Sequence, residues 1–481
     1  MKSIYNSPMI GWVPNRCLYM VFAVALLPAL LLEVVNAANT NSTVNKPNIC
    51  ILLADDLRAD CLGILGHPIV KTPNLDGVCK EGHIFRNTYV LGSNASAVCI
   101  PSRQMILKGV SYLRPGFRNN HKIPTMAETF REAGYLSMRA GKPKNGDEVF
   151  DENQYGGHAD GNADYLVEFI EKNAGGDKPL FLYMAGHEPH DSQYAPDEYY
   201  SRYQPADIPM PVSFLPYHPF DNGAMLEADE FRTLKWPRTK EALQAKLAKY
   251  YASTTFWDAE AGRVIEALKQ AGQYENTIFV VSSDNGYSNG DHGLMGKQNL
   301  YEFGGMHSFV IFAGPGIPKG ESKALAYLMD IYPTLCELTE TKIPNELDAK
   351  SLAPVISGKS PKVRDYLFTA FKKNQRAIRD DRWKLIRYPL INKTQFFDLE
   401  NDPHEMNDLF DQPENADRIK VLMAALQEKQ KRFGDKAPLT VDNPADPAWN
   451  PGIGKEELAK RTAKRAAMNS GNGSSKREAG K

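Results

Sequence analysis

The sequence lacks an excess of either charge. Its 481 residues include 57 Lys and Arg and 58 Asp and Glu, so the formal net charge is -1. The basic surface that nucleic-acid-binding proteins need is therefore missing, and we expect no nucleic-acid partner. An anionic substrate would have to be held by a local group of cations, because the overall field will not attract it. Apolar residues make up 42% and charged residues 24%, which is typical of a globular protein.

Long apolar runs are scarce. The stretch 18–32 follows Lys2 and Arg16 and ends near the small-residue site 35–37. It is shorter than the roughly 20 residues that span a bilayer, and it matches a secretory signal. We predict a signal peptide over 1–37, no transmembrane segment after its removal, and a periplasmic or secreted protein. A retained N-terminal anchor is the alternative.

Cysteine is also scarce, with six residues in the chain. Cys17 would leave with the signal, so five of the six would remain in the mature protein. An odd number fits one chemically special cysteine but assigns no disulfide pairing.

Three apolar runs predict the core of the fold. Residues 48–54, 181–185 and 277–282 are each apolar over most of their length, which is typical of strands buried on both faces. Helical patterns lie between them, the clearest over 241–271. Strands that alternate with helices predict a mostly parallel sheet covered on both sides.

Polar side chains follow each of these three runs. They are Asp55 and Asp56, then His187 and His190, then Asp284 and Asn285. In sheets of this kind ligands bind beyond the carboxyl ends of the strands, so the three groups are expected to form one site. Asp and Asn are also common turn residues, which is the alternative for each pair alone. The oxygen ligands of Asp55, Asp56, Asp284 and Asn285 favour a hard divalent cation such as calcium or magnesium. No Cys/His cluster has the spacing typical of a zinc site.

The segment 99–109 is the most informative part of the chain. It reads Cys99-Ile100-Pro101-Ser102-Arg103 and closes at Gly109. Pro101 suits the first position of a helix and Gly109 suits its end, so Cys99 would lie at a helix N-terminus that favours an anion. A cation in the first helical turn is unfavourable, so Arg103 indicates an anionic partner. A structural cysteine beside a surface arginine is the alternative.

This string resembles the signature of the type I sulfatases, a family of the alkaline phosphatase superfamily. In that family a maturation enzyme oxidises the cysteine to formylglycine, which the resemblance implies for Cys99. Further matching segments extend from about Lys46 to beyond Asp408. The resemblance implies an alkaline-phosphatase-like α/β/α sandwich with a mostly parallel central sheet, followed by a small C-terminal α+β domain with an antiparallel sheet.

The chain is predicted to have four segments. A signal peptide over 1–37 precedes a catalytic domain over 46–361, an α+β subdomain over 362–454 and a disordered basic tail over 455–481. The subdomain is predicted from short strands and one helix, which are expected at 366–371, 375–379, 383–388, 395–399 and 414–433. The tail is rich in Lys, Arg, Ala, Ser and Gly without periodicity.

The resemblance also implies roles for single residues. One calcium ion would be held by Asp55, Asp56, Asp284 and Asn285, with the formylglycine made from Cys99 completing its shell. Lys142 and Lys297 would hold the sulfate oxygens, and Arg103 would support the formylglycine and the metal. His190 would protonate the leaving alcohol, because the leaving oxygen gains negative charge in the transition state.

Two departures from the family pattern stand out. Relatives continue Gly-Lys-x-His after the lysine, where the histidine assists sulfate release, but this chain has Lys144 at that place. We predict that Lys144 binds the substrate. To act as a base in place of the histidine, it would need a lowered pKa. The other departure is His307-Ser308-Phe309, where relatives tend to carry Arg-Val-Pro.

The sequence therefore predicts an exported sulfatase that hydrolyses a sulfate ester, with a sulfated saccharide as the favoured substrate. A phosphomonoester or phosphonate monoester hydrolase on the same core is one alternative. A non-catalytic protein that binds sulfated polysaccharide is the other, and the intact Cys99 string and acidic ligands argue against it.

Overall fold

A mixed sheet of nine strands, counted over the described residues, carries the three predicted apolar runs. The computed structural model describes residues 46–117, 122–142, 150–227, 230, 232–449, 456, 459–460 and 463. The strand order is β11-β2-β10-β7-β1-β6-β4-β5, with β12 beside β2. The strands are β1 (Asn48–Asp55), β2 (His83–Tyr89), β4 (Leu136–Gly141), β5 (Glu152–Tyr155), β6 (Leu180–Pro189), β7 (Thr277–Ser283), β10 (His307–Ala313), β11 (Gly320–Ser322) and β12 (Ala326–Tyr327).

The centre of this sheet is parallel. Strand β1 lies between β6 and β7 and is parallel to both, and β4 is parallel to β6 and β5. Strand β10 runs antiparallel to β7 and β2. The predicted mostly parallel sheet is therefore confirmed, and the carboxyl ends of β1, β6 and β7 meet at one edge.

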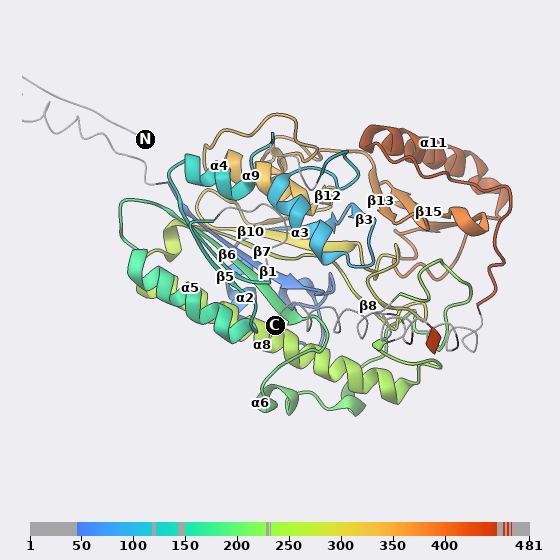
Figure 1. Ribbon diagram of the computed structural model, residues 1–481, viewed down its shortest axis with the longest axis horizontal. Coiled ribbons are helices and arrows are strands. Elements are labelled where there is room, and N and C mark those ends of the chain that lie inside the picture. Colours follow the sequence, from blue (N-terminus) through green and yellow to red (C-terminus); the bar gives the residue numbers. More distant parts are fainter. Residues whose placement is uncertain are drawn as a thin grey trace, which may run out of the picture. The chain divides into compact units, whose positions relative to one another are not determined.

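Both faces of the sheet are covered, as the apolar runs predicted. Along β1, Ile49 and Ile51 belong to one hydrophobic core and Cys50 and Leu52 to the other, and all four are fully buried. Figure 1 shows α2, α5 and α8 on one side of the sheet and α3, α4 and α9 on the other. Burial of an aliphatic side chain contributes about 1.5–3 kcal/mol, so a strand that feeds two cores anchors the fold.

The longest helix, α8, matches the predicted helix over 241–271. It runs over Lys240–Gln270, and the Thr239 side chain caps its N-terminus by accepting from the amide of Ala242. The α-helices are α2 (Pro73–Cys79), α3 (Cys99–Lys108), α4 (Met126–Glu132), α5 (Ala159–Asn173), α6 (Asp197–Tyr200), α8, α9 (Ile331–Leu338), α10 (Ala353–Ile356) and α11 (Ala416–Phe433). Single 3-10 turns occupy Gly63–Leu65, Pro205–Asp207, Tyr274–Asn276, Leu328–Asp330, Pro389–Ile391 and Pro413–Asn415.

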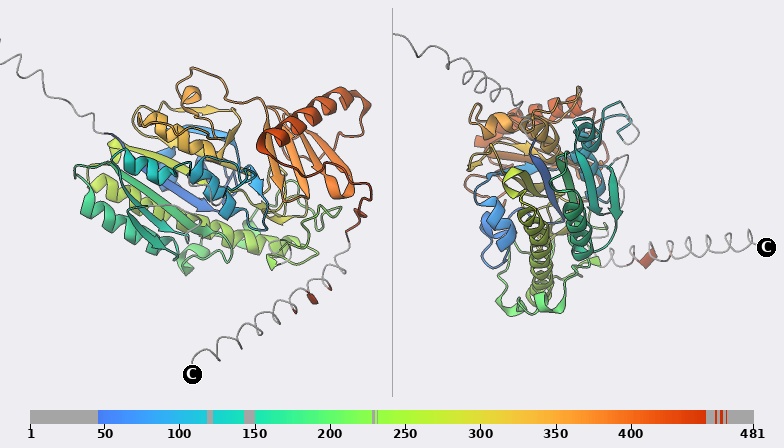
Figure 2. Two further views of the ribbon diagram at one scale, coloured as in Figure 1. Left: turned by 45° about the horizontal axis from the view of Figure 1, so that its top comes forward. Right: turned by 90° about the vertical axis from the view of Figure 1, so that its left-hand side faces the viewer.

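A second sheet has the order β16-β15-β14-β13-β3, and α11 lies along it (Figure 2). Its strands are β3 (Gly92–Ser93), β13 (Leu367–Phe371), β14 (Gln375–Arg379), β15 (Trp383–Tyr388) and β16 (Lys393–Asp398). Strands β13 to β16 pair antiparallel in chain order, which confirms the predicted C-terminal sheet.

Strand β3 joins this sheet from the segment ahead of Cys99, which the sequence did not predict. It runs parallel to β13. Gly92 has a φ of 136°, and a Cβ there would lie 1.8 Å from the carbonyl oxygen of Ala370, so only glycine fits. The predicted boundary at residue 361 stays a prediction.

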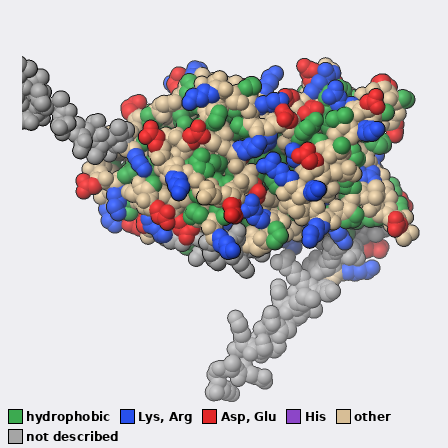
Figure 3. Space-filling view, turned by 90° about the horizontal axis from the view of Figure 1, so that it is seen from above, with side chains coloured by type: hydrophobic (Ala, Val, Ile, Leu, Met, Phe, Trp, Pro, Cys, Tyr) green, Lys and Arg blue, Asp and Glu red, His purple; other side chains and the backbone are tan. Residues whose placement is uncertain are grey.

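Two further observations concern the predicted absence of a transmembrane segment and the near-zero net charge. In the part of the chain that the structure describes, we find no helix with the length and apolarity of a membrane span. The predicted signal peptide lies outside the described residues. On the face seen in Figure 3, basic and acidic side chains are interspersed, in keeping with the near-zero net charge.

Candidate active site

The carboxyl ends of β1 and β7 bring the predicted metal ligands together. Asp55 ends β1, and Asp56 follows it in a left-handed conformation with a φ of 63°. Asp284 comes directly after β7, and its amide bonds to the carbonyl of Ala54. The amide of Asp56 donates to Asp284 Oδ1 at 3.2 Å, so the expected convergence of these two pairs is confirmed.

The donor atoms of this acidic cluster (Asp55, Asp56, Asp284 and Asn285) fit a hard cation. Carboxylate oxygens from the three aspartates lie within 4.8 Å of one another, and all three side chains are buried. Asn285 uses its Nδ2 to donate to Asp56 Oδ1 at 2.7 Å. Its own Oδ1 and Asp55 Oδ1 are buried without a hydrogen-bond partner. Oxygen atoms without a hydrogen-bond partner are the ligands that calcium or magnesium prefers.

The carboxyl groups of the acidic cluster differ in pKa. Burial raises the pKa of the Asp55 carboxyl, but Arg103 and Lys142 outweigh it and hold that pKa well below the usual range. Burial and the neighbouring Asp55 raise the pKa of Asp284 to about 6, against the effect of Arg103. A divalent cation bound here would favour the charged form of both carboxyl groups.

Helix α3 carries Cys99 at its start, and here one prediction was wrong. The helix begins at Cys99, so Pro101 is its third residue and not its first. A proline fits there because the first amides of a helix have no intrahelical acceptor. Gly109 ends the helix with a φ of 66°, as predicted. The Ser102 hydroxyl donates to the carbonyl of Asp284, which ties the first turn of α3 to the acidic cluster.

Arg103 has the anionic partner that its position indicated. Its side chain is fully buried, and Nε donates to Asp284 Oδ2 at 2.7 Å. One terminal nitrogen donates to the carbonyl of Gly186 at 3.0 Å and lies 3.4 Å from Asp55 Oδ2. The guanidinium therefore joins the ends of β1, β6 and β7.

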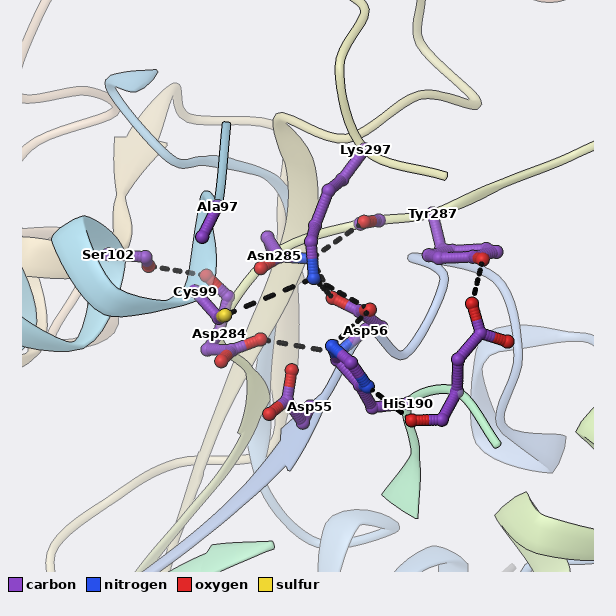
Figure 4. Close-up of polar contacts among 12 residues, drawn as sticks. Asp55, Asp56, Ala97, Cys99, Ser102, His190, Asp284, Asn285, Tyr287 and Lys297 are labelled. Atoms are coloured by element: carbon purple, nitrogen blue, oxygen red, sulfur yellow. Dashed lines mark hydrogen bonds and ion pairs between the residues drawn. The ribbon is translucent and has the colours of Figure 1, made fainter. Parts of the chain in front are cut away.

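Two lysines face the acidic cluster from separate elements. Lys297 follows β9 (Met295–Gly296), which pairs with β8 (Ser288–Asn289), and its Nζ lies 2.7 and 2.8 Å from the two Asp56 oxygens. The same Nζ is 3.9 Å from Cys99 Sγ (Figure 4). Lys142 follows β4, with its Nζ 2.6 Å from Asp55 Oδ2.

The Cys99 thiol is itself a poor nucleophile in this setting. Burial raises its pKa to about 12, against the opposite effect of Lys297, so the thiol stays protonated at neutral pH. Reactivity of cysteine depends on the thiolate. An unmodified thiol here could pack but would not attack. The five cysteines of the described part, Cys99 included, are free and buried.

His190 reaches the site from the end of β6. The strand was expected to end at Ala185, but it continues to Pro189, so His187 belongs to the strand and His190 to the turn after it. His190 Nδ1 lies 2.7 Å from the carbonyl of Asp191. A carbonyl can only accept, so Nδ1 carries a proton, and Nε2 faces Asp56 Oδ2 at 3.5 Å (Figure 4).

Asp191 is a site residue that the sequence analysis missed. Its carboxylate accepts from the hydroxyls of Thr233 at 3.0 Å and Tyr287 at 3.1 Å, and it pairs with Lys246. These contacts hold the turn that presents His190. No sequence signal marked Asp191 beyond its place next to a predicted catalytic histidine.

The two departures from the family pattern have different outcomes. Lys144 lies outside the described residues, so its role stays a prediction. His307 starts β10, and its ring nitrogens face the carbonyls of Glu302 at 2.9 Å and Arg86 at 2.8 Å. Glu302 is paired with Lys384 and with a second cation, Arg379, both from the C-terminal sheet. His307 thus ties β10 to β2.

The fold and this edge of the sheet define the class of protein. A parallel core with a buried acidic cluster, a helix-borne cysteine and two flanking lysines is a hydrolase centre of the alkaline-phosphatase-like type, which acts on anionic esters.

Comparisons with known proteins give the family. The Sulfatase family model matches residues 47–341, more than half of the chain, and the model "N-sulphoglucosamine sulphohydrolase, C-terminal" matches 290–432. The chain belongs to the sulfatase family of sulfuric ester hydrolases, which confirms the resemblance. An arylsulfatase of Clostridium perfringens (strain 13 / Type A) is 28% identical, with 81% of this chain and 96% of the relative covered.

Solved structures show the same fold. One is an enzyme in complex with its substrate D-glucosamine-2-N,6-O-disulfate, with a TM-score of 0.70, 22% identity, and coverage of 82% of this chain and 99% of the other. A phosphonate monoester hydrolase of Agrobacterium radiobacter has a TM-score of 0.68 and 22% identity, covering 82% of this chain and 96% of the other.

Proposed function

We propose that this protein hydrolyses the sulfate ester of a sulfated saccharide, with Cys99 converted to formylglycine and one calcium ion at the acidic cluster. The observation that carries the proposal is the meeting of Cys99, Lys297 and Asp56 within one buried centre. The C-terminal family model and the structure with a glucosamine disulfate both name sulfated sugars, which supports a saccharide substrate.

Each residue of the centre would have a separate role in sulfate binding or proton transfer. Lys142 and Lys297 would bind the sulfate oxygens, since each Nζ borders the acidic cluster. Their positive charges would also stabilise the transition state. His190 in its imidazolium form would donate the Nε2 proton to the leaving oxygen, while its Nδ1–H, held by the Asp191 carbonyl, orients the ring. When bound, calcium supplies Lewis-acid stabilisation of the anion, and the formylglycine supplies the attacking oxygen.

Arg103 and Ser102 would position the nucleophile. Both bond to Asp284 from the first five residues of α3, so residue 99 is fixed relative to the acidic cluster. Such positioning contributes to rate because a misplaced nucleophile forfeits the advantage of proximity.

The test is activity of protein produced with and without a formylglycine-generating enzyme. Protein with the modification at residue 99, verified by peptide mass spectrometry, should release sulfate from a panel of defined sulfated saccharides. Protein with an intact thiol should not. Full activity with an alkylatable Cys99 would refute the mechanism.

A phosphonate or phosphate monoester hydrolase is the second candidate. The Agrobacterium radiobacter enzyme shares the fold, and a metal with flanking cations suits either tetrahedral anion. Matched aryl sulfate, phosphate and phosphonate esters separate the two, since the same leaving group isolates the anion. A higher kcat/KM for the phosphonate would favour this candidate.

Two further proposals concern residues outside the described part. Export rests on Lys2, Arg16 and the stretch 18–32, and a mature N-terminus near Ala38, determined by mass spectrometry, would support it. Lys144 would assist sulfate release or bind an anionic group. If it is catalytic, Lys144→Ala slows turnover after a burst of alcohol, whereas a binding role raises KM alone.

A further inference from the structure

Three side chains with metal-binding chemistry lie together beside the active site without a role in it. His158 is the residue before α5, and His187 and Glu188 belong to the end of β6. One potential ligand atom from each lies within 4.8 Å of the other two. We call these three residues the histidine cluster. Its members differ in kind from the oxygen-only donors of the acidic cluster.

Glu188 is a buried carboxylate that His158 and the backbone amides of Glu188 and Ala159 stabilise, with one oxygen left over. The residue is fully buried, and its Oε1 lies 2.6 Å from His158 Nδ1. Its Oε2 is buried and has no hydrogen-bond partner. Burial raises the pKa of this carboxyl, against the effect of His158. A carboxylate oxygen buried without a partner is costly, so an unsatisfied one calls for a further partner.

His187 also has a buried polar atom without a hydrogen-bond partner. Its Nδ1 is buried and makes no hydrogen bond among the described residues. Burial and the nearby Lys142 lower the pKa of this imidazole to about 4, so the ring is neutral at neutral pH. Neutral imidazole is the form that binds a metal.

We propose that His158, His187 and Glu188 bind a divalent transition metal ion of the zinc type, at a second site distinct from the acidic cluster. Two imidazoles and one carboxylate are a donor set that zinc takes and that calcium does not favour. The fourth position would be open to water or to an anion.

The surroundings suit such a site. The ring of His158 stacks on Tyr194 with centroids 3.9 Å apart, which fixes its orientation. The His158 side chain is 44% exposed, so an ion can enter from solvent. The ring centroid of His187 lies 5.3 Å from that of His190, so a bound dication would add positive charge next to the proposed proton donor.

A purely structural role makes different predictions. Glu188 could simply hold His158 at the start of α5, where backbone amides also lower the pKa of the carboxyl. Glutamine at 188 would then serve as well, and no metal would bind.

Cobalt(II) is the probe, because its visible absorption reports imidazole and carboxylate ligands and zinc should displace it. The full chain is stripped with a chelator, supplied with excess calcium, and titrated with cobalt. We expect one equivalent to bind with visible bands that zinc abolishes. His158→Ala and Glu188→Gln should weaken binding by at least about 100-fold. Circular dichroism and thermal melting confirm that both variants fold.

Two control variants test whether the cobalt ion binds at the histidine cluster and not elsewhere. His404 is a half-buried histidine stacked on Phe303, also with an unpartnered Nδ1, and His404→Ala should bind cobalt as wild type does. Asp284→Ala removes a ligand of the acidic cluster and should also keep the cobalt bands. Loss of the bands in Asp284→Ala, unchanged binding in Glu188→Gln, or no cobalt bound by the wild type would each overturn the proposal.

Discussion

Replacing Arg103 with methionine is expected to destabilise the protein strongly. Methionine is unbranched and apolar, is shorter than arginine, and has neither charge nor hydrogen-bond donors. Arg103 is fully buried and bonds to Asp284 Oδ2 at 2.7 Å and to the Gly186 carbonyl at 3.0 Å. Its loss leaves the buried Asp284 carboxylate without its cation and the Gly186 carbonyl without this donor. Breaking a buried pair by removing one partner costs about 3–5 kcal/mol, and we expect a loss in that range.

Urea unfolding measures this loss, first in a chelator and then with calcium. Without the guanidinium the acidic cluster has more negative charge to offset, so calcium should stabilise Arg103→Met more than wild type. An ion at 100 times its Kd adds about 2.7 kcal/mol. The matched variant Arg103→Lys restores the charge but not the planar guanidinium, so its free energy of unfolding should lie between those of wild type and Arg103→Met.

If Arg103→Met lies within about 1 kcal/mol of wild type in chelator, the guanidinium does not support the cluster. If calcium stabilises wild type and variant equally, the two cations do not share the same carboxylates.

Three more predictions follow from the site and the core. Cys99→Ala should abolish sulfate release while circular dichroism stays native, because the variant offers no residue to modify. His190→Gln should lower kcat by about 10²–10⁴ for saccharide sulfates but much less for 4-nitrophenyl sulfate, whose leaving group needs no proton; equal losses would contradict its acid role. Burial lowers the pKa of His218 from 6.5 to about 3, so the folded state binds its proton less well than the unfolded state. The contribution of neutral His218 to the free energy of unfolding is therefore complete above pH 6.5 and falls by about 2 kcal/mol by pH 5. The variant His218→Asn should flatten that part of the pH profile of the free energy of unfolding, measured with urea.

The sequence predicted the three central strands of the main sheet, β1, β6 and β7, and the acidic cluster, for physical reasons. Residues 49–54 are apolar at every position, as a strand packed between two cores requires. Parallel strands place their carboxyl ends at one edge, so Asp55 and Asp284 had to meet. The Cys99 string was found by resemblance, and periodicity alone would not have singled it out.

Details that depend on neighbouring strands were not predictable. β6 continues to Pro189 because Asp55 pairs with Pro189 across the bulge in the β1–β6 ladder. Nothing local in His187-Glu188-Pro189 indicates a strand. β3 joins the second sheet through two residues, too few for any pattern. His158 meets Glu188 only because α5 starts beside the end of β6, a contact between residues 30 apart.

The two lysines link the acidic cluster to the proposed sulfate site. Lys297 bonds to both oxygens of Asp56, and Lys142 bonds to Asp55. A cation bound to these carboxylates would compete with the ammonium groups for the same oxygens. The lysines would then have charge and donors available for a sulfate group, so metal and sulfate should each favour the binding of the other. The same buried carboxylates would thus order the site in two ways, by holding the lysines in place and by releasing them when the metal binds.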